Sequence, residues 1–398
     1  MTEQNSLAAR AKTWLATHLD QLFPIFRLVK PNIMLGGKAI ITTFDDVQEV
    51  LSRNDVFHVP YAEKMFKVTN GSNFFLGMQE TPTYTRDHSN MRIVVRREDI
   101  PDRVMPFVVK EADDILNIAG GSIDVVQGLS RLIPARLLGD YFGTPGWNEQ
   151  EFIDAATMMF QYLFYPDAPG IPEKALAAAA TTREYLDKTI AARKSKRGSR
   201  DDVIERCLEL QDAGTPGMED VTIRNNLIGL IIGAIPTNSK CVALVLDYLF
   251  DHPPLLADAQ QAARLDQDEV LLQTMLECIR LNPFAIGIQR ICSEDYVVAQ
   301  GTLRRLKIPK GTGVLAATQS AMMDCRRIQD PKSYRLDRPY YQYMHWGYSL
   351  HTCFGEYMNL TTIPQMVKAV LKRENLQRVA KMESVGPFPV SLKVTYKA

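Results

Sequence analysis

A ten-residue segment near the end of the chain, WGYSLHTCFG at 346–355, holds the residues best suited to chemistry. Its cysteine, Cys353, comes just before a predicted helix, EYMNLTTI, and the positive end of a helix favours a thiolate over a thiol. Gly347 and Gly355 allow the backbone to approach a flat ligand closely. A thiolate held in this way is a soft ligand that suits iron. The alternative is that Cys353 is a small buried hydrophobic residue, as most single cysteines are.

A second pair of chemically informative residues lies some seventy positions earlier. In Glu277-Cys-Ile-Arg280 a carboxylate and a guanidinium are three positions apart, on one face of a predicted helix. Such pairs are common on solvated faces, but this helix is apolar. The helix is followed by Asn282-Pro283 and then by Arg290. The acidic and basic residues of the helix and this arginine therefore all precede the cysteine segment.

This ordered set resembles the cytochrome P-450 family of haem-thiolate enzymes, over roughly residues 35–398. The family's cysteine loop reads F-G-x-G-x-H/R-x-C-x-G. The matching positions here are Trp346, Gly347, His351, Cys353 and Gly355, with Ser349 in place of the second glycine. The resemblance implies the cytochrome P-450 fold, a triangular helical prism around a buried haem b, with Cys353 as the axial iron ligand. It also implies that Glu277 and Arg280 are structural and tie the core near the haem to the following segment.

Haem carries two propionates, on which cationic or hydrogen-bond-donating side chains should converge. The resemblance implies three sources: an H-x-x-x-R pair, an arginine after the E-x-x-R helix, and the basic residue two positions before the cysteine. The residues that fit are His88 with Arg92, then Arg290, then His351. Two alternatives stay open for the first pair. It lies one turn earlier, at Tyr84 and His88, or it consists of ordinary solvated surface groups.

The largest departure from the family lies in the long central helix. The family normally has A/G-G-x-D/E-T there, an acid–alcohol pair that relays protons during oxygen activation. The matching stretch is GAIPTN at 233–238, which sets Ile235 in the place of the acid and Pro236 in the place of the threonine. Because proline inside a helix clashes with the carbonyl four residues earlier, we expect a kink over the haem. Thr237 and Asn238 are then the candidate catalytic residues, which hold water or substrate.

The resemblance implies a monooxygenase that inserts one oxygen atom from dioxygen into an apolar organic substrate. We expect electrons from an external ferredoxin and ferredoxin reductase, because 398 residues leave no room for a fused reductase. The lost acid keeps two other hypotheses open: a peroxide-dependent peroxygenase or hydroperoxide isomerase of the same fold, and a haem sensor or carrier without activity. Peroxygenases of the family carry an Arg-Pro pair at this point. This chain shares the proline but has Ile235, so no carboxylate anchor is evident.

Residues 150–175 are rich in methionine and aromatic side chains, and by resemblance they lie near the lid over the substrate pocket. The side chains concerned are Met158, Met159, Phe160, Tyr162, Phe164 and Tyr165. Such a stripe is more often ordinary core. If it lines the pocket, the substrate is apolar and the loop from Tyr61 to Phe75 closes the other side.

The elements that must position these residues are mostly helical. KAIITTF at 38–44 predicts a strand, DDVQEVLSR a helix, and NGSNFFLGMQETPTYT at 70–85 a loop. From about 100 to 290, apolar residues three and four apart predict helices, among them a long buried one over 221–251. After 290 we expect small hairpins, the cysteine loop, a last helix and an edge strand at 390–398. The fold class is therefore mostly α with a minor β portion, in a single domain over 1–398.

Composition excludes several classes of protein. The 46 basic residues balance the 46 acidic ones, which argues against a nucleic-acid or anionic-membrane partner. Six scattered cysteines without a C-x-x-C motif exclude a disulfide scaffold and a zinc finger. The N-terminus lacks an uninterrupted apolar core, and the longest apolar run, 227–235, is broken off by Pro236, Asn238 and Lys240, so we expect neither a signal peptide nor a membrane span. We expect a cytoplasmic monomer.

Overall fold

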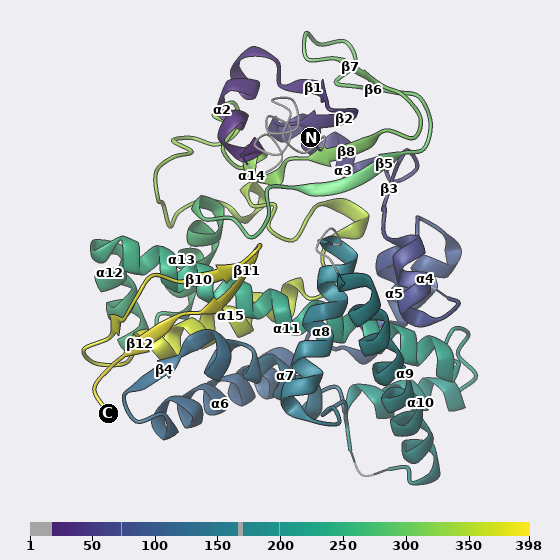
Figure 1. Cartoon of the computed structure of the whole chain (residues 1–398), viewed down its shortest axis with the longest axis vertical. Coiled ribbons are helices and arrows are strands. Elements are labelled where there is room, and N and C mark those ends of the chain that lie inside the picture. Colours follow the sequence, from purple (N-terminus) through teal and green to yellow (C-terminus); the bar gives the residue numbers. More distant parts are fainter. Residues whose placement is uncertain (1–17, 73, 166–169, 199) are drawn as a thin grey trace, which may run out of the picture. The chain divides into compact units, whose positions relative to one another are not determined.

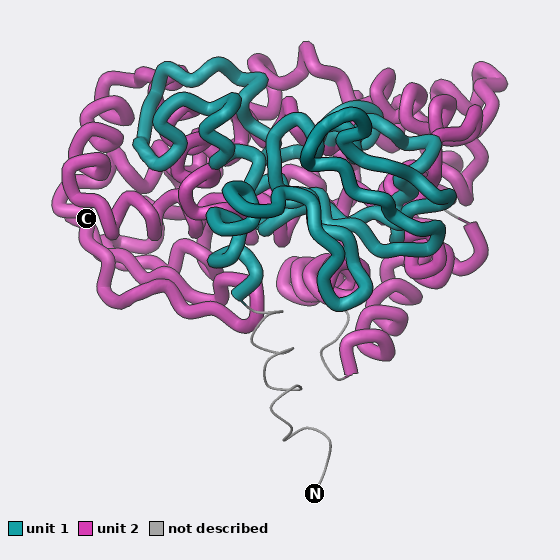
Figure 2. The backbone as a smooth tube through the Cα atoms, turned by 90° about the horizontal axis from the view of Figure 1, so that it is seen from above, with its two compact units in different colours: residues 1–60, 285–352 teal, residues 61–284, 353–398 magenta. Residues whose placement is uncertain are grey.

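The computed structural model describes residues 18–72, 74–165, 170–198 and 200–398, so the predicted absence of a signal peptide falls mostly outside the described residues. The chain divides into two compact units (Figures 1 and 2). Unit 1 consists of residues 1–60 and 285–352, and unit 2 of residues 61–284 and 353–398. Each unit therefore combines two stretches that are far apart in the sequence. The expectation of a single domain stays a prediction.

Unit 1 is built on a five-stranded sheet with the strand order β1-β2-β8-β5-β3. Strands β2 and β8 are parallel and the other neighbours are antiparallel. Its strands are β1 (Asn32–Leu35), β2 (Lys38–Ile41), β3 (Phe57–His58), β5 (Ile288–Cys292), β6 (Tyr296–Val298), β7 (Leu306–Ile308) and β8 (Gly313–Ala316), of which β6 and β7 form a separate hairpin. Its helices are α2 (Leu19–Val29), α3 (Phe44–Ser52), α14 (Thr318–Ala321), η5 (Tyr340–Gln342) and η6 (Ser349–His351). The strand and the helix predicted over 38–53 are confirmed.

Unit 2 is mostly helical, which together with unit 1 confirms the expected fold class. Its helices are α4 (Ala62–Thr69), η2 (Phe75–Gly77), α5 (Pro82–Val94), η3 (Ile100–Val104), α6 (Met105–Ile118), η4 (Val126–Ser130), α7 (Leu132–Asp140), α8 (Glu149–Phe164), α9 (Ile171–Ser195), α10 (Val203–Asp212), α11 (Asp220–Asp251), α12 (Pro253–Arg264), α13 (Asp268–Leu281) and α15 (Glu356–Leu371). Its strands are β4 (Ser122–Asp124), β9 (Gln377–Arg378), β10 (Glu383–Val385), β11 (Phe388–Ser391) and β12 (Lys393–Thr395).

Helix α11 is the central helix of unit 2, as predicted. It packs against α7, α8, α9, α13 and α15, and most of its apolar side chains are buried (Figure 1). By length and composition alone α11 is apolar enough to cross a membrane, but 72% of its most apolar 18-residue window is buried inside the protein. It runs as one helix through Pro236, and the kink expected there stays a prediction.

The loop predicted over 70–85 is wrong in its last part, because α5 begins at Pro82. The hydroxyl of Thr81 accepts a hydrogen bond from the backbone N–H of Tyr84 at 3.1 Å, and proline occupies the first turn. Threonine followed by proline is a helix-start signal that we read as loop composition. The segment from Tyr61 to Phe75 also contains a helix, α4, where a loop was expected.

The edge strand predicted at the C-terminus is wrong as well. Strand β12 is the central strand of a three-stranded antiparallel sheet, with β4 on one side and β9 on the other. Val394 in β12 is fully buried. The sequence of β12 does not indicate which strands it pairs with, since β4 lies about 270 positions earlier in the chain.

Candidate functional site

Cys353 lies three residues before α15, where the backbone N–H groups of Gly355 and Glu356 lower the pKa of its thiol. Burial is the larger effect and raises that pKa overall, while the charge of Arg92 lowers it. The side chain is nevertheless accessible to solvent, whereas Cys207, Cys278 and Cys292 are buried. Cys353 is therefore not a buried hydrophobic residue, and its sulfur is available to a ligand.

Helix α5 holds two of the predicted site residues against the cysteine loop. Arg92 Nη1 donates a hydrogen bond of 2.8 Å to the carbonyl oxygen of Phe354, and its guanidinium lies 3.9 Å from the centre of that ring. The imidazole of His88 lies 5.5 Å from the Phe354 ring and stacks on Tyr84 at 5.6 Å. Unit 2 thus brings Cys353, His88 and Arg92 together.

His88 and Arg92 are both half-buried, so the alternative of ordinary surface groups does not hold. Burial lowers the pKa of each, and the charge of Arg92 lowers that of His88 further. At neutral pH His88 is therefore a neutral imidazole, with one hydrogen-bond donor and one acceptor, and Arg92 supplies the positive charge. Tyr84, the other residue of the alternative pair, is buried and stacks on His88.

The other two predicted propionate ligands belong to unit 1. Arg290 lies in β5, is 4% exposed, and donates from Nη1 to the carbonyl oxygen of Gln289 at 3.0 Å. His351 ends η6 and is half-buried. Gly347 has a φ of +87°, and a β-carbon there would meet the Ile288 side chain in β5 at 3.3 Å. The glycine in this loop is thus required by its own backbone and by its contact with β5.

The Glu277–Arg280 pair forms a fully buried salt bridge on α13. Arg280 Nε lies 2.6 Å from Glu277 Oε1 and Arg280 Nη2 lies 2.7 Å from Glu277 Oε2, and both side chains are inaccessible to solvent. Two parallel hydrogen bonds fix the orientation of the guanidinium as well as its charge. This geometry fits a structural pair rather than a solvated one.

One face of α11 is accessible to solvent, and it carries Thr237. Gly233 is exposed and Ala234 and Thr237 are half-buried, whereas Ile235 and Pro236 are buried. The Thr237 hydroxyl donates to the carbonyl oxygen of Gly233. A β-carbon at Gly233 would meet nothing within 4 Å. Pro236, which we aligned with the family's threonine, therefore points away from the accessible face that Thr237 occupies.

Asn238 is 5% exposed and joins α11 to α15. Its amide nitrogen donates to the carbonyl oxygen of Ala234 at 2.9 Å and to Asn359 Oδ1 at 3.1 Å. Its amide oxygen accepts a hydrogen bond of 2.9 Å from the hydroxyl of Thr362. Since α15 starts just after Cys353, this contact fixes the α11 turn with Thr237 against the helix that follows the cysteine.

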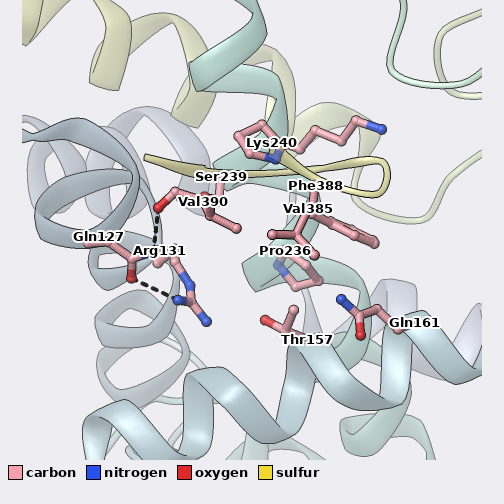
Figure 3. Close-up of a pocket in the computed structure, with 11 residues that line it drawn as sticks. Gln127, Arg131, Thr157, Gln161, Pro236, Ser239, Lys240, Val385, Phe388 and Val390 are labelled. Atoms are coloured by element: carbon pink, nitrogen blue, oxygen red, sulfur yellow. Dashed lines mark hydrogen bonds between the residues drawn. The ribbon is translucent and has the colours of Figure 1, made fainter. Parts of the chain in front are cut away.

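A pocket of about 230 Å³ lies beside the same part of α11 (Figure 3). Side chains of η4, α8 and α11 face the β10–β11 hairpin across it. The lining residues are Gln127, Arg131, Thr157, Gln161, Pro236, Ser239, Lys240, Val385, Phe388, Pro389 and Val390. The hairpin side is apolar, the other sides are mostly polar, and none of the described lining residues is acidic.

Half of the methionine and aromatic stripe predicted over 158–165 is buried core, whereas Met158, Phe164 and Tyr165 are half-buried. Met159 is fully buried, and Phe160 and Tyr162 are each 6% exposed. Phe160 and Tyr165 pack on Phe388 at 5.7 and 5.5 Å, so they support the pocket wall from behind. The α8 residues that do line the pocket, Thr157 and Gln161, carry no apolar or aromatic signal in the sequence.

Sequence reasoning also missed Lys240. It is 6% exposed, and its ammonium donates a hydrogen bond of 2.6 Å to the carbonyl oxygen of Phe284 and lies 4.4 Å from the centre of that ring. Burial lowers its pKa to about 8. A single lysine within the apolar stretch of a central helix was the available signal, since charged residues are seldom buried without a reason.

These residues fit the haem that the resemblance implies. The accessible Cys353 sulfur is a soft ligand for iron, and Arg92 and His88 are donors for carboxylates. Within the described ranges, no three histidine, cysteine or acidic side chains gather as a metal site. The accessible α11 face at Gly233 and Ala234 has small residues, which suits a flat ring.

Comparisons with known proteins agree with this reading. The family model for cytochrome P450 matches residues 31–377. The mycinamicin IV hydroxylase/epoxidase of Micromonospora griseorubida is 22% identical over 365 residues, which cover 89% of this chain and 86% of that protein. The bifunctional dioxygenase–epoxy alcohol synthase of Pyricularia oryzae is 20% identical over 382 residues, which cover 85% of this chain but 33% of that protein.

The fold is also found in solved structures. The crystal structure of CYP108D1 from Novosphingobium aromaticivorans superposes with a TM-score of 0.77, at 19% identity, over 97% of this chain and 95% of that one. A family match over most of the chain, an exposed cysteine three residues before α15, and the same fold all agree. The chain belongs to the cytochrome P450 family, and it is a haem-binding monooxygenase of that family.

Proposed function

We propose that this cytochrome P450 inserts one oxygen atom from dioxygen into a C–H or C=C bond of an apolar organic molecule. The other oxygen atom leaves as water, so each turnover takes up two electrons and two protons. We propose a separate ferredoxin and its reductase as the electron source. Haem bound through Cys353 supplies the activation of dioxygen. The relative named hydroxylase/epoxidase supports both kinds of bond as targets.

The observation that carries this proposal is the accessible position of Thr237 on α11. Its hydroxyl donates to the Gly233 carbonyl, which leaves the oxygen free to accept a hydrogen bond from a water that delivers protons. Positioned proton donors typically contribute about 10² to 10⁴-fold. Because the amide of Asn238 is already bonded to Ala234, Asn359 and Thr362, we assign proton delivery to Thr237 and the packing of α11 on α15 to Asn238.

We further propose that Arg92, His88, Arg290 and His351 hold the haem propionates. Arg92 and His88 lie beside Phe354, next to the iron ligand. Arg290 and His351 are the family's matching positions in unit 1. Replacing Arg92 with Gln should lower the fraction of haem retained on dialysis, because a charged hydrogen-bond donor is lost.

The thiolate is tested by the spectrum of the reduced carbon-monoxide complex. The protein should show the long-wavelength Soret band of a thiolate ligand, and a Cys353→His variant should bind haem without that band. A Cys325→Ser variant is the control, since Cys325 is also exposed but lies in unit 1, outside the cysteine loop. A thiolate-type band that survives in Cys353→His would remove Cys353 as the ligand.

The role of Thr237 is tested with valine, which keeps the shape of threonine and removes the hydroxyl. We expect Thr237→Val to form about 10 to 100-fold less product per NADPH consumed, with more hydrogen peroxide released. Thr237→Ser should stay close to the wild type. Asn238→Ala should lower the unfolding midpoint while leaving the product yield per NADPH of the folded enzyme unchanged.

A second candidate function is the isomerisation of an organic hydroperoxide to an epoxy alcohol. This reaction rearranges the atoms of one molecule, so it needs no dioxygen, electrons or net protons. The stretch of α11 before Thr237 favours it, since Ile235 stands in the place of the family's acid and Pro236 in the place of its threonine. One relative is named for an epoxy alcohol synthase activity, although this chain spans about a third of its length.

Turnover with different oxidants separates the two candidates. The monooxygenase needs NADPH, ferredoxin and reductase, and the label of ¹⁸O₂ should appear in the product. The isomerase should convert linoleic acid hydroperoxide at a rate that electron partners do not improve. Product from the hydroperoxide alone, with none from dioxygen and NADPH, would replace the first proposal with the second. A monomeric, cytoplasmic protein is also part of the proposal, and size-exclusion chromatography and cell fractionation test it.

A further inference from the structure

The ammonium of Lys240 is a buried charge without a carboxylate partner in the described part of the chain. Its hydrogen bond goes to the carbonyl oxygen of Phe284, and its nitrogen lies 4.4 and 5.7 Å from the ring centres of Phe284 and Phe388. Lys368, by contrast, is also buried but pairs with Asp266 and Asp268. Burying an unpaired ammonium is unfavourable, so a ligand of opposite charge would be stabilised beside it.

The pocket beside Lys240 has the charge to attract such a ligand. Arg131 also lines it, but Asp154 lies 2.7 Å from that guanidinium and balances it. Among the residues that the structure describes, no acidic side chain lines the pocket, so none of them compensates the charge of Lys240 there. An ammonium has three donors, and the Phe284 carbonyl takes one of them. Two donors are left for the oxygens of an anion.

The size and walls of the pocket indicate an organic anion. Its volume of about 230 Å³ exceeds the roughly 150 Å³ that holds a benzene ring in an engineered protein cavity. Val385 and Phe388 of the β10–β11 hairpin form an apolar wall opposite α11 (Figure 3). Lys240 follows Thr237 by three residues, about 4.5 Å along the helix axis. Along the helix axis the two residues are therefore less than one turn apart, and Thr237 is not among the residues that line the pocket.

We propose that Lys240 binds the carboxylate of the substrate, and that this P450 acts on organic acids whose apolar part packs against the β10–β11 hairpin. The oxidation of such an acid rests on the proposed function above, whereas its binding does not. Lys240 is thus the carboxylate anchor that the sequence around Ile235 and Pro236 did not reveal.

The test compares octanoate with methyl octanoate on the haem-loaded protein at pH 7, by calorimetry and by the shift of the Soret band. The two probes share the apolar chain and differ in charge. We expect the wild type to bind octanoate at least 10-fold more tightly than the ester, because the ammonium makes charge-assisted hydrogen bonds. Lys240→Met should weaken octanoate binding about 10 to 100-fold and change ester binding less than twofold. Lys240→Arg should restore most of the affinity for octanoate.

Lys188→Met is the matched control, since Lys188 is an exposed lysine paired with Glu184 on α9. It should bind both probes like the wild type. Equal weakening of both probes in Lys240→Met would make Lys240 a packing residue, and unchanged octanoate binding would exclude it as the anchor. If Lys240→Met does not fold, the wild type alone still tests the proposal. A wild type that binds octanoate no more tightly than the ester would overturn it.

The two proposals fail in different ways. A wild type that binds neither probe but oxidises other compounds with NADPH and ferredoxin would refute the carboxylate site and leave the proposed function intact. A wild type that binds octanoate through Lys240 but forms product only from hydroperoxides would refute the monooxygenase and leave the carboxylate site intact.

Discussion

At the scale of single residues, Ser349 holds its backbone in the left-handed region, with a φ of +63°. The family's cysteine loop has glycine at this position, and the left-handed conformation costs a residue with a β-carbon roughly 1–2 kcal/mol. The greater freedom of glycine in the unfolded chain offsets about half of this cost. We predict that Ser349→Gly raises the free energy of unfolding by about 0.5–1 kcal/mol, measured from guanidinium unfolding midpoints.

Ser349→Ala is the control for that experiment, because it removes the hydroxyl but keeps the β-carbon. It should give no gain in stability. If both variants gain equally, the hydroxyl and not the backbone conformation is responsible, and Ser349 is not strained.

We predict that Lys240 makes the stability of the fold depend on pH, because burial lowers its pKa from 10.5 to about 8. Between pH 8 and 10.5 the unfolded chain binds more protons than the folded one, so this group makes the protein more stable as the pH rises. Below pH 8 the full free-energy cost of burying the charged Lys240 is present, and it is about 3 kcal/mol for this difference in pKa. Lys240→Met removes it but also loses the hydrogen bond to Phe284, worth about 1 kcal/mol.

We therefore predict that Lys240→Met is more stable than the wild type by about 2 kcal/mol at pH 7. The advantage should shrink as the pH rises from 8 to 10. Unfolding midpoints at pH 7, 8, 9 and 10 measure this, with Lys188→Met for comparison. A difference that stays constant across this range would mean that the charge of Lys240 is not what destabilises the fold.

At the scale of elements, α13 depends on the buried pair of Glu277 and Arg280. Removing one partner leaves a buried charge without its counterion, which typically costs about 3–5 kcal/mol. We predict a loss of this size for Glu277→Gln, seen as a lower denaturant midpoint and faster haem release. Glu63→Gln is the matched control, since Glu63 forms an exposed pair with Lys67 on α4. Solvent screens an exposed pair, so the control should lose little stability.

The same elements show what local sequence can predict. The apolar pattern over 221–251 gives α11 to within one residue, since a helix buried on nearly all sides has a long uninterrupted signal. The accessible face of α11 could not be predicted in this way. Its side chains look like the rest of the apolar run, and only the packing of α7, α8 and α15 decides that Thr237 is accessible and Pro236 is not.

The pocket beside Lys240 shows what the sequence cannot predict when the residues of a site lie far apart in the chain. It combines side chains from η4, α8, α11 and the β10–β11 hairpin, which come from four separate parts of the sequence. The motif of the cysteine loop predicts Cys353 because all of its information lies within ten residues. Gln161 and Phe388 have no such pattern, because their shared role exists only once α8 and the hairpin have packed together.

At the scale of the whole molecule, unit 2 is closed by the last strand of the chain. Strand β12 lies between β4 and β9, its Val394 is fully buried, and the hydroxyl of Tyr396 donates to the carbonyl oxygen of Leu116 in α6. The C-terminus therefore holds together segments from residue 116 to residue 378. Burying a valine and a tyrosine contributes about 1.5–3 kcal/mol for each side chain, in addition to the strand hydrogen bonds.

We predict that deleting residues 393–398 destabilises the protein by more than about 4 kcal/mol, which approaches the whole stability of many domains. The variant should lose bound haem at a lower temperature and give a smaller carbon-monoxide band. Deleting Lys397 and Ala398 alone removes an exposed salt bridge to Glu374 and should cost little. If the longer deletion lowered the stability no more than the shorter one, β12 would contribute little to the stability of the sheet. The stability of unit 2 would then come from its helices alone.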